Sequence, residues 1–126
     1  MVKIFNKIIN KFSFPDLIWI QWTIGHLHDS MRIKNSSNYW IDDFVVFMKK
    51  LSKNLKSGGF ICLKENLSQE GFIFDNDDSS ITRTDDHFKH LFKKSNLELK
   101  SEQFQKKFPS YLFKVKMYAL QPIQKE

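Results

Sequence analysis

Cysteine, arginine and glycine are scarce in this sequence, and each shortage excludes a class of protein. Cys62 is the only cysteine, which excludes an internal disulfide framework and a cysteine-based zinc cluster. Arg32 and Arg83 are the only arginines among the 20 basic residues. Because base and phosphate recognition depends on the planar guanidinium group, the net charge of +6 indicates a lysine-rich solvated surface, and no nucleic-acid partner is expected. The four glycines form no GxGxxG-like turn, so the sequence contains no such phosphate loop.

Long hydrophobic runs are also absent. No stretch approaches the roughly 20 apolar residues that a membrane-spanning helix needs, so no membrane association is expected. Lysines interrupt residues 1–12, so no signal sequence is expected there, and the apolar spacing of these residues predicts a short amphipathic helix. A cytosolic or nuclear location fits the single cysteine best.

The apolar residues that are present suffice for one small domain with a real core. Hydrophobic residues make up 41% of the 126 residues and aromatic residues 15%, which excludes a wholly disordered chain.

The first half of the chain predicts a strand–helix–strand unit. The continuous apolar run Leu17–Trp22 is typical of a strand that is buried on both faces. A polar loop is expected over residues 30–38. Apolar residues then recur at helical spacing from Tyr39 to Leu55, and Ser57-Gly58-Gly59 is a typical helix stop. A second buried strand, Phe60–Lys64, completes a right-handed βαβ unit.

The second half predicts a loop, a helix and an antiparallel strand pair. Residues 65–80 are expected to form the loop, with Lys64 and Glu65 making a local contact at the end of the strand. Thr84-Asp85-Asp86 is expected to cap a helix that ends near Lys94. Residues 97–100 and 111–120 alternate between apolar and polar, which predicts two strands at the edge of the sheet. The predicted fold class is α/β.

Two polar loops follow the carboxyl ends of the two buried strands, where open α/β sheets bind their ligands. Taken singly, the polar residues of these loops would only solvate the loops or cap helices. Together they predict one site on one side of the sheet, made of an aromatic wall, an imidazole, an amide and carboxylates: Trp22, His26, Asn66, Asp75, Asp78 and Ser80.

Two motifs in these loops resemble the signatures of the eukaryotic protein N-terminal (α-amino) methyltransferases. The first is Leu17–Trp22 followed by Ile24-Gly25-His26-Leu27. The second is Lys64-Glu65-Asn66, then Gln69-Glu70-Gly71 and residues 75–80. The resemblance covers residues 15–120, between a leader of residues 1–14 and a tail of residues 121–126. It implies a single partial domain, the C-terminal half of a seven-stranded Rossmann-like class I methyltransferase fold, whose first strands and cofactor loop would precede Met1.

The resemblance implies transfer of a methyl group from S-adenosylmethionine to the free α-amino group of proteins that begin with Xaa-Pro-Lys. By resemblance, Gln21 contacts the cofactor and Trp22 walls the channel for the substrate peptide. Asn66 holds the first peptide carbonyl group.

The same resemblance assigns the remaining positions. Asp75, Asp78 and Ser80 receive the third-position lysine or orient the amine, and His26 and Asp78 are the candidate bases. Phe113 stands where the family tends to carry a tyrosine near the peptide channel, and residues 30–41 look like an insertion.

Three hypotheses follow from the sequence. The chain descends from an enzyme whose main cofactor-binding half is absent here, it is a truncated and inactive peptide-binding remnant, or it is a structural remnant without activity. Strand Leu17–Trp22 is expected to have an unpaired edge through which another chain could pair.

Overall fold

The structure is a computed structural model that describes residues 14–27, 32–34, 39–41, 43–71, 73–75, 80–107, 109 and 112–124. The predicted helix over residues 1–12 lies outside this range. The elements are, in chain order, β1 (Leu17–Gln21), the 3-10 helix η1 (Ile24–His26), β2 (Arg32–Lys34), β3 (Tyr39–Ile41), α2 (Asp43–Lys53), β4 (Phe60–Leu67), β5 (Ile73–Asp75), β6 (Ser80–Thr82), α3 (Asp85–Lys94), β7 (Leu97–Phe104) and β8 (Lys114–Pro122).

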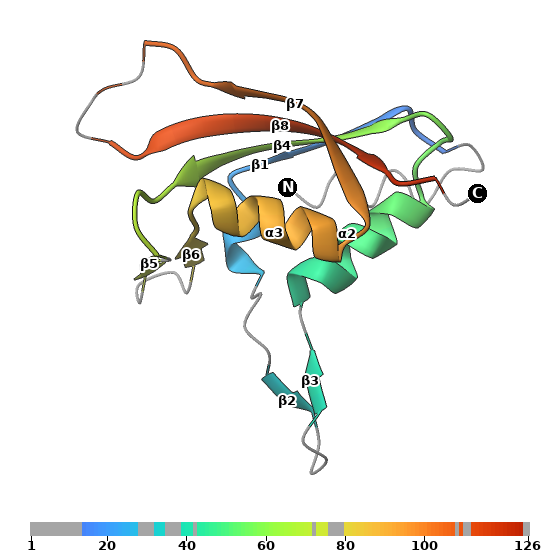
Figure 1. The fold of residues 1–126 in the computed structure, drawn as a ribbon, viewed down its shortest axis with the longest axis horizontal. Coiled ribbons are helices and arrows are strands. Elements are labelled where there is room, and N and C mark those ends of the chain that lie inside the picture. Colours follow the sequence, from blue (N-terminus) through green and yellow to red (C-terminus); the bar gives the residue numbers. More distant parts are fainter. Residues whose placement is uncertain are drawn as a thin grey trace.

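Four of these strands form one sheet in the order β1-β4-β8-β7 (Figure 1). β1 and β4 run parallel, and the chain connects them through α2, which confirms the predicted strand–helix–strand unit. β8 is antiparallel to both β4 and β7. The pair β7–β8 therefore forms the predicted antiparallel edge of the sheet.

Glycine is required where β1 and β4 begin side by side. The Phe60 amide donates to the Asp16 carbonyl oxygen at 2.9 Å, and the Lys56 amide donates to the Pro15 carbonyl oxygen at 2.9 Å. A Cβ atom on residue 59 would lie 2.7 Å from the Asp16 oxygen, a contact that real side chains do not make. Gly59 thus permits the close approach of the two strands.

Helices α2 and α3 pack on the same face of the sheet and enclose the core (Figure 1). Ile18 and Ile20 of β1 point to this face beside their register partners Ile61 and Leu63. A buried aromatic group joins the helices to the sheet, and in it the Phe92 ring of α3 meets the Tyr118 ring of β8 edge-on at 5.1 Å. The whole cluster comprises Ile18, Ile20, Ile24, Phe44, Val45, Met48, Leu51, Leu55, Ile61, Leu63, Leu67, Phe88, Leu91, Phe92, Leu97, Tyr118 and Leu120.

The prediction that β1 is buried on both faces is wrong for this chain. Ile18 and Ile20 are buried, but Leu17 is 51% exposed and Trp19 is 38% exposed. The physical reason is that both described helices cover the face to which Ile18 and Ile20 point. The alternate residues of β1 belong to the other face.

The helix predicted over residues 39–55 is shorter than expected, because Tyr39–Ile41 is the strand β3. Its aromatic and β-branched residues favour an extended chain, and β2 offers them an antiparallel partner within the predicted loop over residues 30–38. The helix begins at Asp43, whose carboxylate lies in the first turn, where the helix dipole favours a negative charge.

The loop predicted over residues 65–80 is also partly ordered into strands. β4 continues to Leu67 because β8 is long enough to pair with it, up to the partners Leu67 and Lys114. β5 and β6 then form an antiparallel hairpin. By contrast, α3 begins as predicted, and the Thr84 side chain accepts a hydrogen bond from the His87 amide at 3.1 Å.

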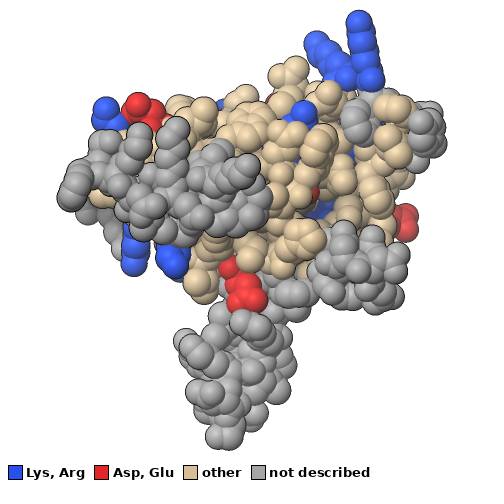
Figure 2. All heavy atoms as spheres, turned by 180° about the vertical axis from the view of Figure 1, so that it is seen from behind, with Lys and Arg blue, Asp and Glu red and all other residues tan. Residues whose placement is uncertain are grey.

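Charged side chains are concentrated at the margins of the face seen in Figure 2, and uncharged residues make up most of its described centre. Among the residues that the structure describes, no helix has the length and apolar character required to cross a membrane.

A cluster of charged side chains ties α3 to the last two strands. Lys116 Nζ lies 2.8 Å from Asp85 Oδ1 and 2.5 Å from Glu102 Oε1, and Lys89 Nζ lies 2.9 Å from Asp85 Oδ2. The Tyr118 hydroxyl donates to Asp85 Oδ1 at 2.6 Å. Burial favours the neutral form of Asp85, but the hydrogen bonds from Lys116, Tyr118 and Lys89 outweigh it and lower the pKa of Asp85 to about 2.

We predict that Asp85→Asn destabilises the fold at pH 7 by about 1 kcal/mol, a value discounted for the partial solvent screening of the cluster. The folded-state pKa of Asp85 lies below its usual value of 3.8, so its contribution is complete above about pH 4 and is lost as the pH falls towards 2. Urea unfolding at pH 7 and at pH 2.5 measures both effects.

Asp86→Asn is the matched control, because Asp86 lies in the same helical turn and is exposed. Equal losses of stability in the two variants would show that the helix dipole, and not the cluster, accounts for the effect.

Candidate functional site

The carboxyl ends of β1 and β4 meet at one rim of the sheet. Gln21 is the register partner of Lys64, and the Trp22 amide donates to the Lys64 carbonyl oxygen at 3.1 Å. Gln21 is half-buried, and its Oε1 atom accepts a hydrogen bond from Trp19 Nε1 at 3.0 Å. The two loops that the sequence analysis singled out therefore start side by side.

Trp22 is held at this rim with its indole ring open to solvent. Its φ angle of 51° lies in the left-handed region, which non-glycine residues adopt only at a cost. The side chain is 48% exposed, and Lys64 Nζ lies 5.4 Å from the centre of the ring. An exposed aromatic wall next to a cation is suited to contact with a peptide.

The chain then turns tightly through η1. The His26 amide donates to the Thr23 carbonyl oxygen at 3.2 Å, and the Leu27 amide donates to the Ile24 carbonyl oxygen at 3.0 Å. Ile24 is fully buried and anchors the turn, whereas His26 is exposed on it.

A buried carboxylate joins this turn to β4. Glu65 is 7% exposed, and its Oε2 atom accepts a hydrogen bond from the Ile24 amide at 3.2 Å. Burial raises the pKa of Glu65, although the backbone amides of Ile24, Thr23 and Asn66 and the charge of Arg83 oppose the rise. The expectation of a local contact for Glu65 is wrong, because β4 continues past this residue and its carboxylate reaches a distant turn.

Arg83 holds the same turn from the other side. Its fully buried guanidinium group donates to the carbonyl oxygens of Ile24, at 3.5 Å, and Leu27. The group also lies 5.2 Å from the Phe44 ring centre and 5.8 Å from the Phe88 ring centre. The sequence analysis assigned no role to Arg83. Its only signal was that arginine is rare in this chain.

The β5–β6 hairpin lies next to this turn. Asp75 and Ser80 are register partners in the hairpin, β6 contacts η1, and the Ser68 amide donates to the Arg83 carbonyl oxygen at 2.9 Å. The structure thus brings the backbones of both polar loops together at the same rim. Asp78 lies outside the described residues.

Asn66 belongs to the other face of β4. Alternation along the strand places Asn66 and Lys64 on one face, both half-buried, and Glu65 on the face covered by the helices. Gln21 shares the face of Lys64, its register partner. The structure therefore brings Gln21 and Asn66 to one face, while the turn that carries His26 is bonded to the opposite face.

An open hollow of about 540 Å³ adjoins the end of β4. Three partly exposed apolar side chains line it: Phe113 is 43% exposed, Ile73 44% and Leu112 48%. The sequence analysis named Phe113 by resemblance but did not find the hollow. Its lining is Leu67, Gln69, Glu70, Ile73, Leu112, Phe113 and Lys114.

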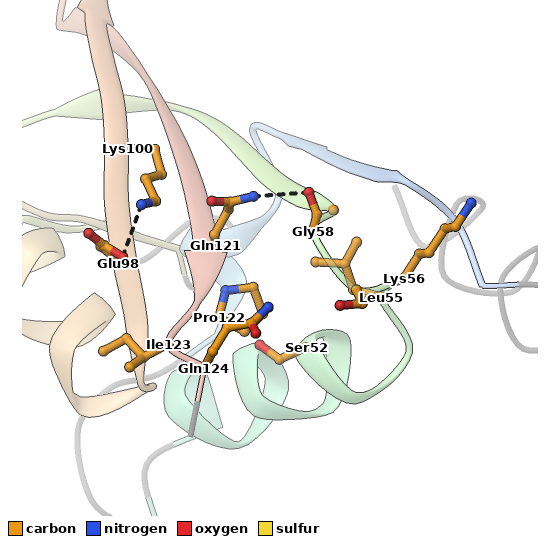
Figure 3. A pocket seen from close by; sticks show the side chains of 12 residues that line it. Ser52, Leu55, Lys56, Gly58, Glu98, Lys100, Gln121, Pro122, Ile123 and Gln124 are labelled. Atoms are coloured by element: carbon orange, nitrogen blue, oxygen red, sulfur yellow. Dashed lines mark hydrogen bonds and ion pairs between the residues drawn. The ribbon is translucent and has the colours of Figure 1, made fainter. Parts of the chain in front are cut away.

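A second hollow of about 610 Å³ lies at the opposite end of the sheet (Figure 3). Gln121 Nε2 donates to the Gly58 carbonyl oxygen at 2.9 Å there, and Lys100 pairs with Glu98 at 3.1 Å. Its place at the amino end of β4 separates it from the rim where α/β sheets bind ligands. We therefore assign the candidate site to the rim of Gln21, Trp22 and Asn66.

Comparison with known proteins decides the family. Residues 4–121 match the family described as AdoMet dependent proline di-methyltransferase. The chain belongs to this family. It is 47% identical over 105 residues to alpha N-terminal protein methyltransferase 1 of Arabidopsis thaliana and 42% identical over 116 residues to the protein of the same name from Dictyostelium discoideum. These matches cover 83% and 90% of the chain but only 34% and 38% of the two relatives.

Solved structures support the same assignment. A SAM-dependent methyltransferase from Leishmania major aligns with 90% of the chain at 38% identity and a TM-score of 0.71, and 42% of that protein is covered. The predicted class I methyltransferase fold, present in part, is thereby confirmed, as is the family resemblance stated from the two motifs.

We predict that Glu65→Gln leaves the protein at least as stable as the wild type at pH 7. The glutamine oxygen accepts the Ile24 hydrogen bond without placing a charge in a buried site. Because the pKa of Glu65 is raised in the folded state, the stability that Glu65 contributes is complete below its usual pKa of 4.5 and is lost as the pH rises through the folded-state pKa. The wild type and Glu65→Gln should therefore differ in urea stability less at pH 4 than at pH 7.

Glu65→Leu removes the acceptor and should cost about 1–3 kcal/mol at pH 7. Glu70→Gln, at an exposed position near the site, serves as the control. If the glutamine and leucine variants lost stability equally, the hydrogen bond to Ile24 would have no part in holding the turn.

Proposed function

We propose that this chain forms the peptide-binding part of a methyltransferase that acts on the free α-amino group of proteins beginning with Xaa-Pro-Lys. The observation that carries the proposal is the joining of the Trp22–Leu27 turn, the end of β4 and the β5–β6 hairpin at one rim. The names of relatives agree with it, among them the N-terminal Xaa-Pro-Lys N-methyltransferase 1-B of Xenopus laevis, which is 34% identical over 105 residues.

In this proposal the exposed Trp22 indole packs against the first residues of the peptide, where the proline ring offers an apolar surface. Asn66 donates its side-chain amide to the first peptide carbonyl group. Asp75, Asp78 and Ser80 receive the third-position lysine or orient the amine. Carboxylates discriminate a lysine usefully only when the pair is partly buried, since exposed ion pairs contribute about 0–1 kcal/mol.

The reacting group must lose a proton before it can act as a nucleophile. An α-amino group has a pKa of about 7.7–8.0, so most of it is protonated at neutral pH. His26 or Asp78 takes up this proton in our proposal. The deprotonated nitrogen would then accept the methyl group that S-adenosylmethionine supplies, and S-adenosylhomocysteine would be the leaving group.

S-adenosylmethionine supplies the electrophilic methyl group in this AdoMet-dependent family. The described residues fit one side of its site. Gln21 lies at the carboxyl end of β1. Its Oε1 atom accepts a hydrogen bond from Trp19 Nε1, so in our proposal its Nε2 atom donates to the cofactor. The sequence holds no glycine-rich turn for the rest of the molecule, so the main cofactor-binding groups belong to the part of the fold that this chain does not match.

The second candidate function is binding without catalysis. The chain covers only 34% of the Arabidopsis relative and 38% of the Dictyostelium relative, yet it contains every position assigned to the peptide. Such a module would recognise Xaa-Pro-Lys termini and leave them unmodified.

Calorimetry on the purified chain tests the peptide assignment directly. We expect a Ser-Pro-Lys peptide to bind, a Ser-Pro-Glu peptide to bind at least roughly tenfold more weakly, and S-adenosylmethionine not to bind the chain alone. Equal affinity for the two peptides would exclude recognition of the third residue. Methylation of the peptide by the chain alone would overturn the claim that the unmatched part of the fold is needed.

We predict that Asp78→Asn and Asn66→Lys each lower kcat/KM by roughly 100-fold or more in a chimera that joins this chain to the unmatched part of the Dictyostelium relative. The first change removes a carboxylate that can accept the proton or the substrate lysine. The second replaces a neutral donor with a cation close to the substrate amine. Mass spectrometry of a Ser-Pro-Lys peptide measures the rates.

Lys56→Ala is the control, because Lys56 is exposed and lines the hollow at the opposite end of the sheet. Wild-type rates in both site variants would refute the assignment of Asp78 and Asn66.

A further inference from the structure

Arg83 is fixed through its backbone at the end of β4, and its side chain reaches from there to another part of the rim. It directly follows β6 and forms a parallel bridge with Leu67 of β4. Its fully buried side chain donates to the carbonyl oxygens of Ile24 and Leu27. This one residue therefore connects the end of β4 and the β5–β6 hairpin to the turn that carries His26.

The two carbonyl oxygens that Arg83 binds lie on either side of His26 in the chain. The Ile24 oxygen also accepts a hydrogen bond from the Leu27 amide at 3.0 Å, so this oxygen accepts two hydrogen bonds. The Ile24 amide, in turn, donates to the Glu65 carboxylate at 3.2 Å. The His26 side chain is exposed between these anchors, so the rim presents an imidazole whose backbone is held at both ends.

Stability alone gives no reason for a buried arginine at this position. Replacing buried ionic groups by well-packed apolar residues is often neutral or stabilising. An apolar side chain cannot donate to two carbonyl oxygens at once, whereas the planar guanidinium group does so with its fixed fork of N–H donors. The Phe44 and Phe88 rings, with centres 5.2 Å and 5.8 Å away, pack against this group. Arg83 is therefore suited to fixing the direction of the turn.

We propose that Arg83 is a positioning residue for the methyl transfer, which acts through the turn of residues 24–27 to fix the place of the His26 imidazole. The proton passes from the substrate ammonium group to a ring nitrogen of His26, and Arg83 takes no part in that transfer. The inference rests on the proposed function and deepens it, because it separates the residue that accepts the proton from the residue that holds the acceptor. A misplacement of about 1 Å can lower a rate about 100-fold.

A double-mutant cycle tests whether Arg83 acts through His26. The cycle comprises Arg83→Lys, His26→Gln and the double variant, each in the chimera that joins this chain to the unmatched part of the Dictyostelium relative. We expect His26→Gln to lower kcat by roughly 100-fold. Arg83→Lys should lower kcat by roughly tenfold and leave the KM for a Ser-Pro-Lys peptide unchanged, because lysine is a point charge on a flexible stem.

The decisive comparison is the effect of Arg83→Lys in the His26→Gln background. If Arg83 acts through His26, the double variant should have the kcat of His26→Gln alone, since no imidazole is left to position. Losses that multiply would show that Arg83 supports the protein in a way unrelated to His26, and they would overturn the proposal.

Amide hydrogen exchange on the 126-residue chain gives a second readout, which does not depend on activity. Arg83→Lys should speed exchange of the His26 and Leu27 amides by at least roughly tenfold, while the amides that pair β4 with β8 exchange as in the wild type. Ser95→Ala is the matched control, because Ser95 is buried at the far end of α3, where its hydroxyl donates to the Leu91 carbonyl oxygen. This control should leave kcat and exchange in the turn unchanged.

Glu65→Leu acts on the same turn from β4 and keeps the proposal testable if Arg83→Lys does not fold. It removes the acceptor of the Ile24 amide, so its loss of kcat should likewise disappear in the His26→Gln background.

Two results separate this inference from the proposed function. A folded wild-type chimera that binds S-adenosylmethionine but does not methylate the Ser-Pro-Lys peptide would refute the proposed function, and the inference with it. An active chimera in which the losses multiply, or turn amides that exchange as in the wild type in Arg83→Lys, would overturn the inference alone.

Discussion

The candidate site depends on one arrangement of buried charges. The Glu65 carboxylate accepts a hydrogen bond from the Ile24 amide. The Arg83 guanidinium group donates to the carbonyl oxygens of Ile24 and Leu27, so both side chains hold the turn of residues 24–27. Replacing Glu65 with leucine is expected to cost about 1–3 kcal/mol, because the Ile24 amide is then buried without its acceptor. The turn is therefore positioned by β4 and by Arg83 between β6 and α3, and not by its own short sequence.

Much of the fold follows from local patterns in the sequence. Leu17–Trp22 and Phe60–Lys64 form parallel neighbouring strands as predicted, and Thr84 caps α3 as its position before two aspartates indicates. These features depend on hydrophobic periodicity and on capping chemistry within a few residues. The meeting of two polar loops at one rim follows in turn from the rule that parallel strands end on the same side.

The features that the sequence did not reveal depend on partners far apart in the chain. Tyr39–Ile41 fits a helical pattern until β2 is available to pair with it, and β4 continues to Leu67 only because β8 pairs along its whole length. Arg83 is not distinguishable from a surface arginine until the folded chain places its guanidinium group against the Phe44 and Phe88 rings. The roles of Asp75, Asp78 and Ser80 come from family resemblance, and they stay predictions.

The atoms that hold the turn in place differ from the side chains that the turn exposes. Glu65 and Arg83 bind backbone atoms, while the side chains of Trp22 and His26 point to solvent and carry none of these contacts. Descendants of a common ancestor can therefore exchange those two side chains without losing the architecture beneath. The side chains on this rim of the sheet vary independently of folding.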